Sequence, residues 1–425
     1  MLDIKLIRKE QEKIEAKIRT KEPGLELSTV IALDDKIRVI KTKNDQLKSK
    51  RNELSKKVGE LKREGKSGEE LMEEVRGIGD MISSLDHELK TLEAEFQDAL
   101  AKIPNIPADG VKVSQDVADN VCTKTVGEKP TFDFEFKNHL QLNEKLRLFE
   151  FHRTAKTTGS GWPAYRGLGA RLEWALLSYM IDIQILNDFE FWLPPVLVKQ
   201  SIMFGSGQIP KFDGQYYHVS GGETPLYLIP TSEVVLNGLH FDEIIPEEQL
   251  PIKYAAYSPC FRKEAGAAGA NERGLIRVHQ FNKVEMFSFT KPDQSEQMHL
   301  EMIDVAEQIL KGLGLHYRLC ELVTGDMSFT AAKTIDIEVW LPAQNRYYEV
   351  SSISNCTDYQ ARRSHIRTKG KSGKTELVHT LNGSGLATSR LMVALLENNQ
   401  NSDGSVTLPP VLQEKLGMKQ LKAAN

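Results

Sequence analysis

The feature that most constrains this chain is a heptad pattern that occupies most of its first hundred residues. Residues 28–103 contain no proline and only five glycines, and apolar side chains recur at alternating intervals of three and four residues. This spacing puts one apolar stripe on each of two long helices and predicts that the stripes pack together as a coiled coil. The expected seam residues are Leu33, Ile37, Ile40, Asn44, Leu47, Arg51, Leu54, Val58 and Leu61 in the first helix, and Leu71, Val75, Ile78, Ile82, Leu85, Leu89, Leu92, Phe96 and Ile103 in the second.

A glycine-containing turn separates the two helices. The stretch Glu64-Gly-Lys-Ser-Gly-Glu-Glu70 supplies this turn, and Ser67 with Glu70 has the spacing of a capping box that would start the second helix. Because the turn is short, the two helices must run antiparallel. We therefore expect an N-terminal helical domain over residues 1–105, which contains a helical hairpin too thin to hold a pocket.

The two helices differ in charge. Residues 34–66 hold twelve Lys and Arg against six Asp and Glu, whereas residues 67–98 hold two against ten. One interpretation is that the helices pair with each other through these charges. The other is that the surplus cations follow a phosphate backbone, and the sequence leaves both open. The cations that would make such contacts include Lys41, Lys43, Lys48, Lys50, Arg51, Lys56 and Lys57.

Composition narrows the class of protein. The 425 residues are 40% hydrophobic and 27% charged, with a mean hydropathy of -0.38 and a net charge of -4, so we expect a soluble chain of two domains without a membrane span. Charged residues break up the first ten positions, which is unlike a secretory signal. The four cysteines lack metal-ligand spacing, so we expect reduced thiols, no structural zinc and a cytoplasmic location.

The remainder of the chain is expected to fold as an α+β domain. Pro104, Pro107 and Gly110 end the second long helix, and the polar stretch over 106–130 is typical of a linker. Residues 131–425 then alternate short strand-like segments with helical periods such as 170–185 and 298–313, which favours an antiparallel sheet. Complete dinucleotide-binding, phosphate-loop, serine-hydrolase and zinc-protease motifs are all missing from the sequence.

The strongest chemical signal is the segment from Ala255 to Phe289. Two alternating stretches flank a glycine-rich connection over residues 266–274, which predicts two antiparallel strands joined by a long loop. Period-two geometry then places five side chains on one face of the second strand: Arg277, His279, Phe281, Lys283 and Glu285. Arg262 and Glu264 lie on the partner strand. Arginines for phosphate, a ring for a base and carboxylates for a cation suit a nucleotide beside an ammonium group.

This segment resembles motif 2 of class II aminoacyl-tRNA synthetases, in the form found in the bacterial-type seryl-tRNA synthetase family. Other stretches resemble the family in the same order along the chain. They are FWLPP (191–195, with Pro195 in motif 1), FGSGQIPKF (204–212), IPTSE (229–233), LCELVTGDMSFTAAKTIDIEVWLP (319–342), EVSSISNCTDYQARR (349–363) and HTLNGSGLATSRLMVALLEN (379–398). The family also places an antiparallel coiled coil ahead of its catalytic domain, so the resemblance covers nearly the whole chain.

The resemblance implies roles for individual residues around ATP. Arg262 and the motif 3 residue Arg390 would be catalytic, with Arg262 on the α-phosphate and Arg390 joining Arg277 on the β- and γ-phosphates. Glu264 and the Val278 backbone would meet the adenine, and Phe281 would stack on it. The further ATP-binding residues implied are Lys263 and the quartet Glu349, Val350, Ser351 and Ser352, of which Glu349 and Ser352 would bind Mg²⁺.

For the amino acid, the resemblance implies a site for L-serine made by Thr231, Ser232, Glu233, Glu285 and Ser384. It implies ATP-dependent formation of seryl-adenylate and transfer of serine to tRNA(Ser), and the family also serylates selenocysteine tRNA where that exists. Lys41, Lys43, Lys48, Arg51 and Lys56 would contact the long variable arm of the tRNA. A homodimer is also implied.

Two other functions remain as alternatives. One is an adenylating paralogue that loads an amino acid onto a carrier protein, which would normally lack the helical hairpin. The other is a coiled-coil interaction protein with an inactive catalytic domain, although Arg262, Arg277 and Arg390 are all present.

Overall fold

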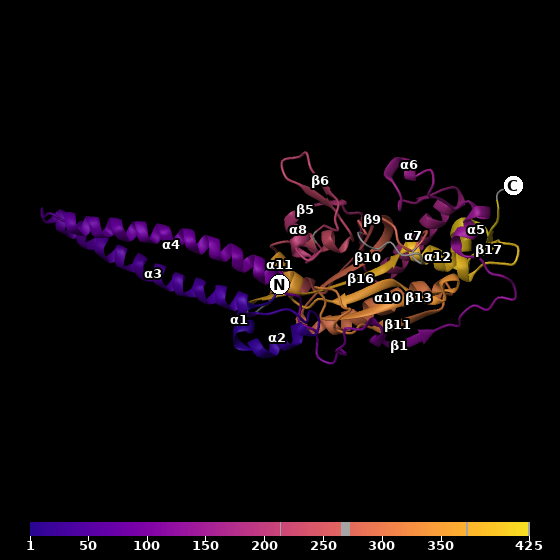
Figure 1. The fold of residues 1–425 in the computed structure, drawn as a ribbon, viewed down its shortest axis with the longest axis horizontal. Coiled ribbons are helices and arrows are strands. Elements are labelled where there is room, and N and C mark those ends of the chain that lie inside the picture. Colours follow the sequence, from indigo (N-terminus) through magenta and orange to yellow (C-terminus); the bar gives the residue numbers. More distant parts are fainter. Residues whose placement is uncertain (213, 265–272, 371–372, 424–425) are drawn as a thin grey trace. The chain divides into compact units, whose positions relative to one another are not determined.

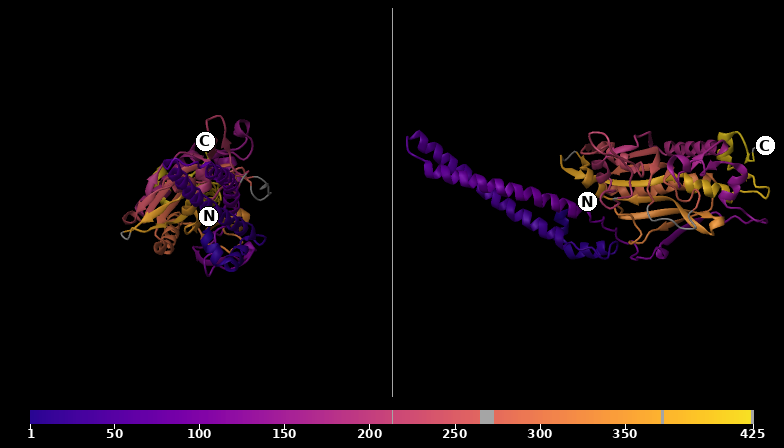
Figure 2. Two further views of the ribbon diagram at one scale, coloured as in Figure 1. Left: turned by 90° about the vertical axis from the view of Figure 1, so that its left-hand side faces the viewer. Right: turned by 45° about the horizontal axis from the view of Figure 1, so that its top comes forward.

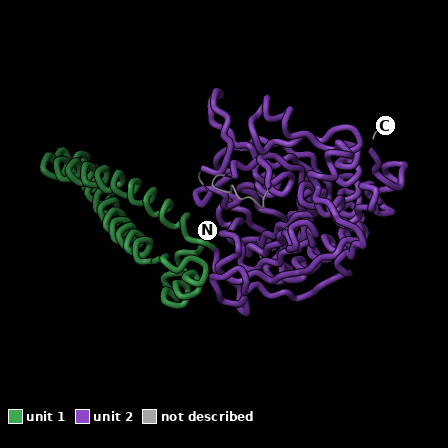
Figure 3. Tube along the Cα trace, turned by 45° about the vertical axis from the view of Figure 1, so that its right-hand side comes forward, with its two compact units in different colours: residues 1–104 green, residues 105–425 purple. Residues whose placement is uncertain are grey.

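The computed structural model describes residues 1–212, 214–264, 273–370 and 373–423, and these separate into two compact units. Unit 1 comprises Met1–Pro104 and unit 2 comprises Asn105–Asn425 (Figure 3). Most of the glycine-rich connection expected over 266–274 lies outside the described residues. None of the helices in the described ranges has the length and apolar content that crossing a bilayer requires.

Unit 1 is helical, and its two long helices run side by side in both views (Figures 1 and 2). Its helices are α1 (Ile4–Lys9), α2 (Gln11–Arg19), α3 (Ser28–Arg63) and α4 (Glu69–Ala101). Every expected seam residue is buried or half-buried, which confirms the heptad prediction. The capping-box prediction at Ser67 is wrong, because α4 begins after Gly68 and has no side-chain cap.

A polar pair interrupts the apolar seam of unit 1. The Asn44 amide nitrogen donates to the Asp86 carboxylate at 2.6 Å, and this hydrogen bond, with that from Lys48, lowers the pKa of Asp86. The buried Asn44 therefore has a partner on the opposite helix, as a residue that fixes the register of a coiled coil requires.

Unit 2 is built on a mainly antiparallel sheet, as predicted for the α+β class. Within the described ranges, eight strands form it in the order β1-β11-β12-β13-β16-β10-β9-β4, and β4 and β9 are the parallel pair. Their bounds are β1 (Val121–Val126), β11 (Tyr317–Glu321), β12 (Lys333–Leu341), β13 (Arg346–Asn355), β16 (His379–Ala387), β10 (Gln280–Thr290), β9 (Ile252–Phe261) and β4 (Glu190–Trp192).

Strand β1 corrects the linker predicted over 106–130. Its residues pair with β11 from Val121 opposite Glu321 to Val126 opposite Tyr317, so this stretch belongs to the sheet. The strand escaped prediction because it lies at the sheet edge, where five of its six side chains are exposed and need no apolar alternation.

Helices cover one face of the sheet. The core packs residues of α7 (Leu168–Leu186), α10 (Ser295–Gly312) and α12 (Thr388–Asn398) against inward-facing residues such as Val284, Met286 and Val350. Both helical periods predicted from sequence are thus present, in α7 and α10. The remaining helices are α5 (His139–Leu146), α6 (Ala155–Thr158), α8 (Gln200–Gly205), α9 (Glu233–Gly238), α11 (Tyr359–Ser364) and α13 (Pro410–Leu416).

Small sheets and single turns complete unit 2. The small sheets are β5 (Leu197–Lys199), β7 (Leu226–Leu228) and β6 (His218–Val219); β15 (Thr375–Leu377), β14 (Arg367–Lys369) and β8 (Ile244–Pro246); β2 (Phe149–Glu150) and β3 (Ala164–Tyr165); and β17 (Val406–Thr407) and β18 (Gln420–Leu421). Short 3-10 turns lie at Val117–Asp119, Glu247–Gln249, Pro292–Gln294 and Pro342–Gln344.

Candidate active site

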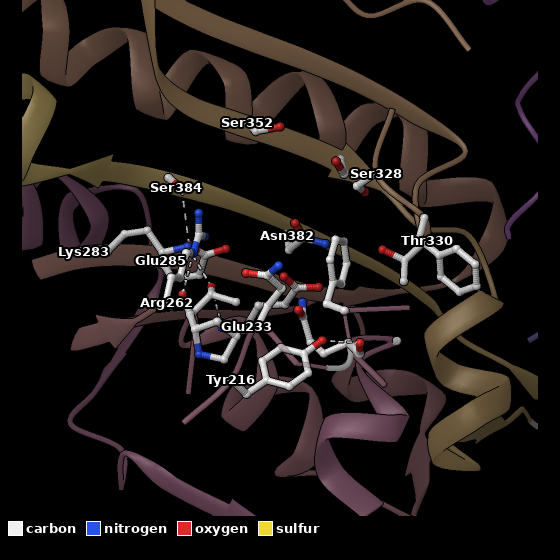
Figure 4. Close-up of a pocket in the computed structure, with 18 of the residues that line it drawn as sticks. Tyr216, Glu233, Arg262, Lys283, Glu285, Ser328, Thr330, Ser352, Asn382 and Ser384 are labelled. Atoms are coloured by element: carbon white, nitrogen blue, oxygen red, sulfur yellow. Dashed lines mark hydrogen bonds and ion pairs between the residues drawn. The ribbon is translucent and has the colours of Figure 1, made fainter. Parts of the chain in front are cut away.

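Two adjoining cavities lie over the centre of the large sheet, where β9, β10, β13 and β16 meet. The larger has a volume of about 440 Å³ and the smaller about 90 Å³. They adjoin because five residues line both: Arg262, Glu264, Lys283, Glu349 and Ser384. Figure 4 shows Arg262, Glu233 and Glu285 gathered in the larger cavity, with Ser352 and Ser384 on neighbouring strands. A volume of this size suits a small-molecule ligand.

The predicted face of β10 carries the site. Phe281 lines the smaller cavity, Glu285 lines the larger, and Lys283 between them lines both, as period-two geometry requires. The Arg262 guanidinium carbon lies 5.2 Å from the centre of the Phe281 ring. Arg262, Phe281 and Glu285 therefore converge on one pair of connected cavities.

The period-two prediction fails before Gln280, because β10 begins at that residue. Arg277 still reaches the smaller cavity, but so do Ile276 and Val278, which the alternation had placed on the opposite face. His279 lines neither cavity. Its Nδ1 lies 3.1 Å from the backbone oxygen of Arg262.

Two carboxylates face the larger cavity from different elements. Glu285 belongs to β10, and Glu233 is the first residue of α9. Both are buried, and Glu233 accepts a hydrogen bond from the Gln360 amide at 2.6 Å. Burial, together with the nearby charge of Glu285, raises the pKa of Glu233 to about 7. An ammonium group entering this cavity would meet two carboxylates, which are groups that pair with cations.

Lys283 connects Glu285 to a hydroxyl group. Its ammonium lies 2.5 Å from a Glu285 carboxylate oxygen and donates to the Thr231 hydroxyl at 2.7 Å. On the other side, Ser384 pairs with Glu285 in the β10–β16 register, and its hydroxyl lies 3.5 Å from the Glu285 carboxylate. The Thr231 and Ser384 hydroxyls thus lie on either side of the Lys283–Glu285 ion pair.

The smaller cavity combines arginines with a ring. The Arg277 guanidinium donates to Glu264 at 2.7 Å, while Arg390 at the start of α12 donates to the Glu349 backbone at 2.8 Å. Arg390 also lies 3.5 Å from the Glu349 carboxylate. Arginines that line one cavity with Phe281 and Val278 suit a polyphosphate attached to an aromatic base.

A β-bulge allows Glu349 and Ser352 to line the same cavity although they are three residues apart. In the β12–β13 register Ile337 pairs with Ser351 and the next residue, Glu338, pairs with Glu349, so Val350 is the extra residue. Ser351 consequently points elsewhere, and its hydroxyl donates to the Ser384 backbone oxygen at 2.6 Å.

The residues around Glu349 and Ser352 fit a hard divalent cation. Asp336 pairs with Ser352 across β12 and β13, and burial with the nearby Glu349 charge raises its pKa well above the ordinary value. Within the described part of the chain, one Asp336 carboxylate oxygen has no hydrogen-bond partner. Carboxylate and hydroxyl oxygens are the donors that Mg²⁺ prefers.

Three predicted site residues do not reach the cavities. Ser232 is fully buried and its hydroxyl lies 2.6 Å from that of Ser258, Ser351 is held as described above, and the Lys263 ammonium lies over the Tyr217 ring. Predicted residues that do line a cavity are Thr231, Glu233, Arg262, Glu264, Arg277, Val278, Phe281, Glu285, Glu349, Val350, Ser352, Ser384 and Arg390.

Sequence reasoning missed several residues of the larger cavity. Lys283 lies between Phe281 and Glu285 on the predicted face of the strand, so the alternation of side chains could have identified it as a cavity residue. Tyr216, Thr330 and Asn382 come from other elements and carry no local signal.

The arm cations of unit 1 divide into two groups. Lys41 and Lys48 lie 2.6 and 3.3 Å from Glu93 and Asp86 on the opposite helix, so they pair within the coiled coil. Arg51 also interacts electrostatically with Asp86. Lys43 and Lys56 are exposed and form no ion pair with any described residue.

Comparison with known proteins identifies the class of each unit. Residues 217–399 match the family model described as the tRNA synthetase class II core domain (G, H, P, S and T). Together with the antiparallel sheet and the arginine-lined cavity, this match defines the unit as a class II aminoacyl-tRNA synthetase core. Residues 1–107 match a second model, the seryl-tRNA synthetase N-terminal domain.

Full-length relatives specify the family. The chain is 56% identical to a serine–tRNA ligase of Chlamydia abortus over 416 residues, covering 98% of each protein. The structure of a Pyrococcus horikoshii seryl-tRNA synthetase complexed with ATP matches all of both chains with a TM-score of 0.93 at 35% identity. A Naegleria fowleri cytoplasmic serine–tRNA ligase in complex with AMP matches 99% of this chain and 96% of its own with a TM-score of 0.85 at 30% identity. The chain belongs to the seryl-tRNA synthetase family.

Proposed function

We propose that this protein activates L-serine with ATP and transfers the seryl group to tRNA(Ser). The observation that carries the proposal is the junction of the two cavities, where Arg262 lies between the acids of the larger cavity and the ring of the smaller one. The serine carboxylate would attack the α-phosphorus there, and pyrophosphate would leave. A terminal ribose hydroxyl of the tRNA would then take the seryl group and release AMP.

The larger cavity is proposed to hold serine. Glu233 and Glu285 receive the ammonium group, while Thr231 and Ser384 surround the hydroxymethyl group. Lys283 holds Glu285 and Thr231 in place through the contacts of 2.5 and 2.7 Å. A site that hydrogen-bonds a hydroxyl discriminates against alanine, because its own buried polar groups would be left without partners.

The smaller cavity and the junction are proposed to hold ATP. Phe281 stacks on the adenine, and Glu264 and the backbone at Val278 contact its edge. Arg262 binds the α-phosphate and stabilises the charge that develops during attack, while Arg277 and Arg390 bind the outgoing phosphates. Arg277 is paired with Glu264 in the described structure, so phosphate binding would require this pair to rearrange. Placement and charge neutralisation suffice for such a reaction, so a protein nucleophile is unnecessary.

Glu349 and Ser352 are the residues proposed to hold Mg²⁺. When bound, the ion neutralises charge on the phosphate oxygens. The donor oxygens of these residues, with the partnerless oxygen of Asp336 beside Ser352, support this assignment.

The α3–α4 arm is proposed to bind the long variable arm of tRNA(Ser). Lys43 and Lys56 can meet phosphates directly, whereas Lys41, Lys48 and Arg51 would exchange their carboxylate partners for RNA. The same contacts would allow selenocysteine tRNA to be a second substrate. The carrier-protein alternative loses support because a unit that matches the family's N-terminal domain is present.

We further propose a cytoplasmic homodimer. Trp174, Leu186 and Leu193 are 59%, 76% and 74% exposed on α7 and just after β4, and large apolar side chains this exposed favour burial against a second copy. All four cysteines are free thiols, which suits the reducing cytoplasm.

Serine-dependent exchange of pyrophosphate into ATP tests the core of this function. The exchange should require serine and should not proceed with alanine. Charging of purified tRNA(Ser), compared with a carrier protein as acceptor, then distinguishes the proposed function from the alternative. Exchange that is independent of serine would refute the proposal.

A further inference from the structure

An aromatic cluster lies beside the larger cavity and plays no part in the roles assigned above. The Trp162 ring centre lies 5.5 Å from that of His279 and 5.6 Å from that of Tyr217. The Lys263 ammonium lies 5.9 Å from the centre of the Tyr217 ring. All four side chains are only partly buried, and none lines either cavity. We call Trp162, Tyr217, His279 and Lys263 the aromatic platform.

Backbone contacts connect this platform to the reaction centre. The Arg262 backbone nitrogen donates to the His279 oxygen at 2.9 Å, and the His279 ring meets the Arg262 oxygen at 3.1 Å. The Lys263 nitrogen donates to the Gln215 oxygen at 3.1 Å, next to Tyr216, which lines the larger cavity. The platform is therefore fixed to the residue proposed to hold the α-phosphate.

The Trp162 segment is also held in a specific conformation. The His279 nitrogen donates to the Gly161 oxygen at 2.9 Å, and Gly161 has φ of +82°, a conformation that favours glycine. A Cβ at position 161 would lie 2.5 Å from the His279 ring. Glycine thus permits the close approach that brings Trp162 to the other two rings.

Three cations lie near Trp162 in the sequence. Arg153 and Lys156 lie nine and six residues before it, and Arg166 lies four residues after it. Arg153 and Arg166 lie 3.7 and 3.9 Å from the Glu150 carboxylate, and the Arg153 side chain is 75% exposed. Lys156 is exposed and forms no ion pair with the residues that the structure describes. Cations combined with accessible rings are the usual means of binding single-stranded nucleic acid.

We propose that the aromatic platform binds the unpaired 3′ end of the acceptor RNA, with a base stacked on Trp162 and a phosphate near Lys263. This inference rests on the proposed function, because the second step needs a terminal ribose beside Arg262. Unpaired RNA bases are recognised by stacking on aromatic side chains, and every base offers such a face. The platform positions the 3′ end for transfer and takes no part in forming the adenylate.

The test compares transfer with activation in the full-length enzyme. Trp162→Ala should lower the rate of single-turnover transfer from enzyme-bound seryl-adenylate to tRNA(Ser) by about fivefold to a hundredfold, the range that loss of one stacked base gives. The ratio of transfer rate to exchange rate should fall by the same factor. Trp162→Phe keeps a ring and should restore most of that ratio. Phe241→Ala removes an exposed ring outside both cavities and serves as the matched control.

Truncated RNA identifies the contact. Removing the three terminal nucleotides of tRNA(Ser) should weaken its binding to the wild-type enzyme, and the loss of affinity on truncation should be smaller in Trp162→Ala. The proposal is overturned if Trp162→Ala still discriminates between the two RNAs as the wild type does. It is also overturned if exchange and transfer fall together, since the rings would then be structural or belong to the ATP site. Absence of serine-dependent exchange in the wild type would instead refute the proposed function.

Discussion

Lys283 and Glu285 are separated by one residue on β10, and their charged groups lie 2.5 Å apart although the two residues are only 5% and 2% exposed. A buried ion pair contributes little net stability compared with apolar residues, but removal of one partner leaves an uncompensated charge in the interior. The pair therefore constrains both the stability of unit 2 and the charge of the larger cavity.

Replacing Lys283 with methionine should destabilise unit 2 by about 3–5 kcal/mol, because Glu285 would remain buried without its cation. Urea unfolding followed by tryptophan fluorescence measures this change. Lys415→Met breaks the 2.6 Å pair with Asp182, whose side chain is half-exposed, and should shift the midpoint far less. Equal shifts in the two variants would show that the burial of the Lys283 pair has no energetic consequence.

Replacing Arg262 with alanine should slow serine-dependent exchange by about 100- to 1000-fold, since one preorganised donor to developing charge is lost. Steady-state exchange kinetics provide the measurement. Arg367→Ala, which removes an arginine paired with Asp242 away from both cavities, is the control and should retain normal exchange. Near-normal exchange in Arg262→Ala would remove this residue from the chemical step.

The pKa of about 7 at Glu233 predicts that serine binding depends on pH. Burial favours the protonated acid below this value, and only the carboxylate attracts the serine ammonium. The KM for serine should therefore fall as the pH rises from 6 to 8. Glu233→Gln should have a higher KM, and its profile should be flatter over the same interval. A wild-type KM that stays constant with pH would contradict the ionisation assigned to Glu233.

A second buried acid predicts a pH dependence of stability. Glu173 of α7 accepts hydrogen bonds from Asn282 at 2.8 Å and from Thr388 at 2.6 Å, and burial raises its pKa from 4.5 to about 7. A raised carboxyl pKa means that the folded state binds the proton more tightly, so its contribution is complete below pH 4.5 and is lost as the pH rises through 7. A rise of the pKa from 4.5 to about 7 corresponds to about 3 kcal/mol.

Glu173→Gln tests this sign, because glutamine can accept the same hydrogen bonds without titrating. Urea unfolding between pH 4.5 and 7.5 should show a smaller loss of stability in the variant than in the wild type. Glu248→Gln, at an exposed carboxylate, should follow the wild-type curve. The burial argument fails if all three curves are parallel.

Charge reversal at Lys43 and Lys56 should raise the KM for tRNA(Ser) and reduce its salt dependence, because two potential phosphate contacts are lost. Serine-dependent exchange occurs in unit 2 and should keep its wild-type rate. The double variant Lys199→Glu/Lys369→Glu, at exposed lysines of β5 and β14, is the matched control for net charge. If the control raises the KM equally, the lysines of the arm contribute to tRNA binding only through the net charge of the protein.

The sequence predicted best where local periodicity decides the structure. The seam of α3 and α4 and the cavity-facing residues Phe281, Lys283 and Glu285 follow from helical and strand geometry alone. A position next to cavity residues in a motif was a poorer guide to whether a side chain lines the cavity. Ser232 is adjacent to two cavity residues, but its side chain turns inward to Ser258.

Tertiary structure determined what the sequence left open. The bulge at Val350 decides that Glu349 and Ser352 share a cavity, and it depends on pairing with β12. Gln360 reaches Glu233 from a helix 127 residues further along the chain, so no local pattern could reveal that contact. The edge strand β1 also lacked a local pattern, because its side chains are mostly exposed and only the pairing with β11 makes it part of the sheet.

The position of β16 in the sheet has a consequence during synthesis. This strand lies between β13 and β10, so two neighbours that are translated earlier cannot be joined until residues 379–387 have emerged from the ribosome. Arg390 follows only three residues later. A nascent polypeptide that has not been translated past Arg390 therefore lacks the centre of the sheet and one of the arginines that line the smaller cavity.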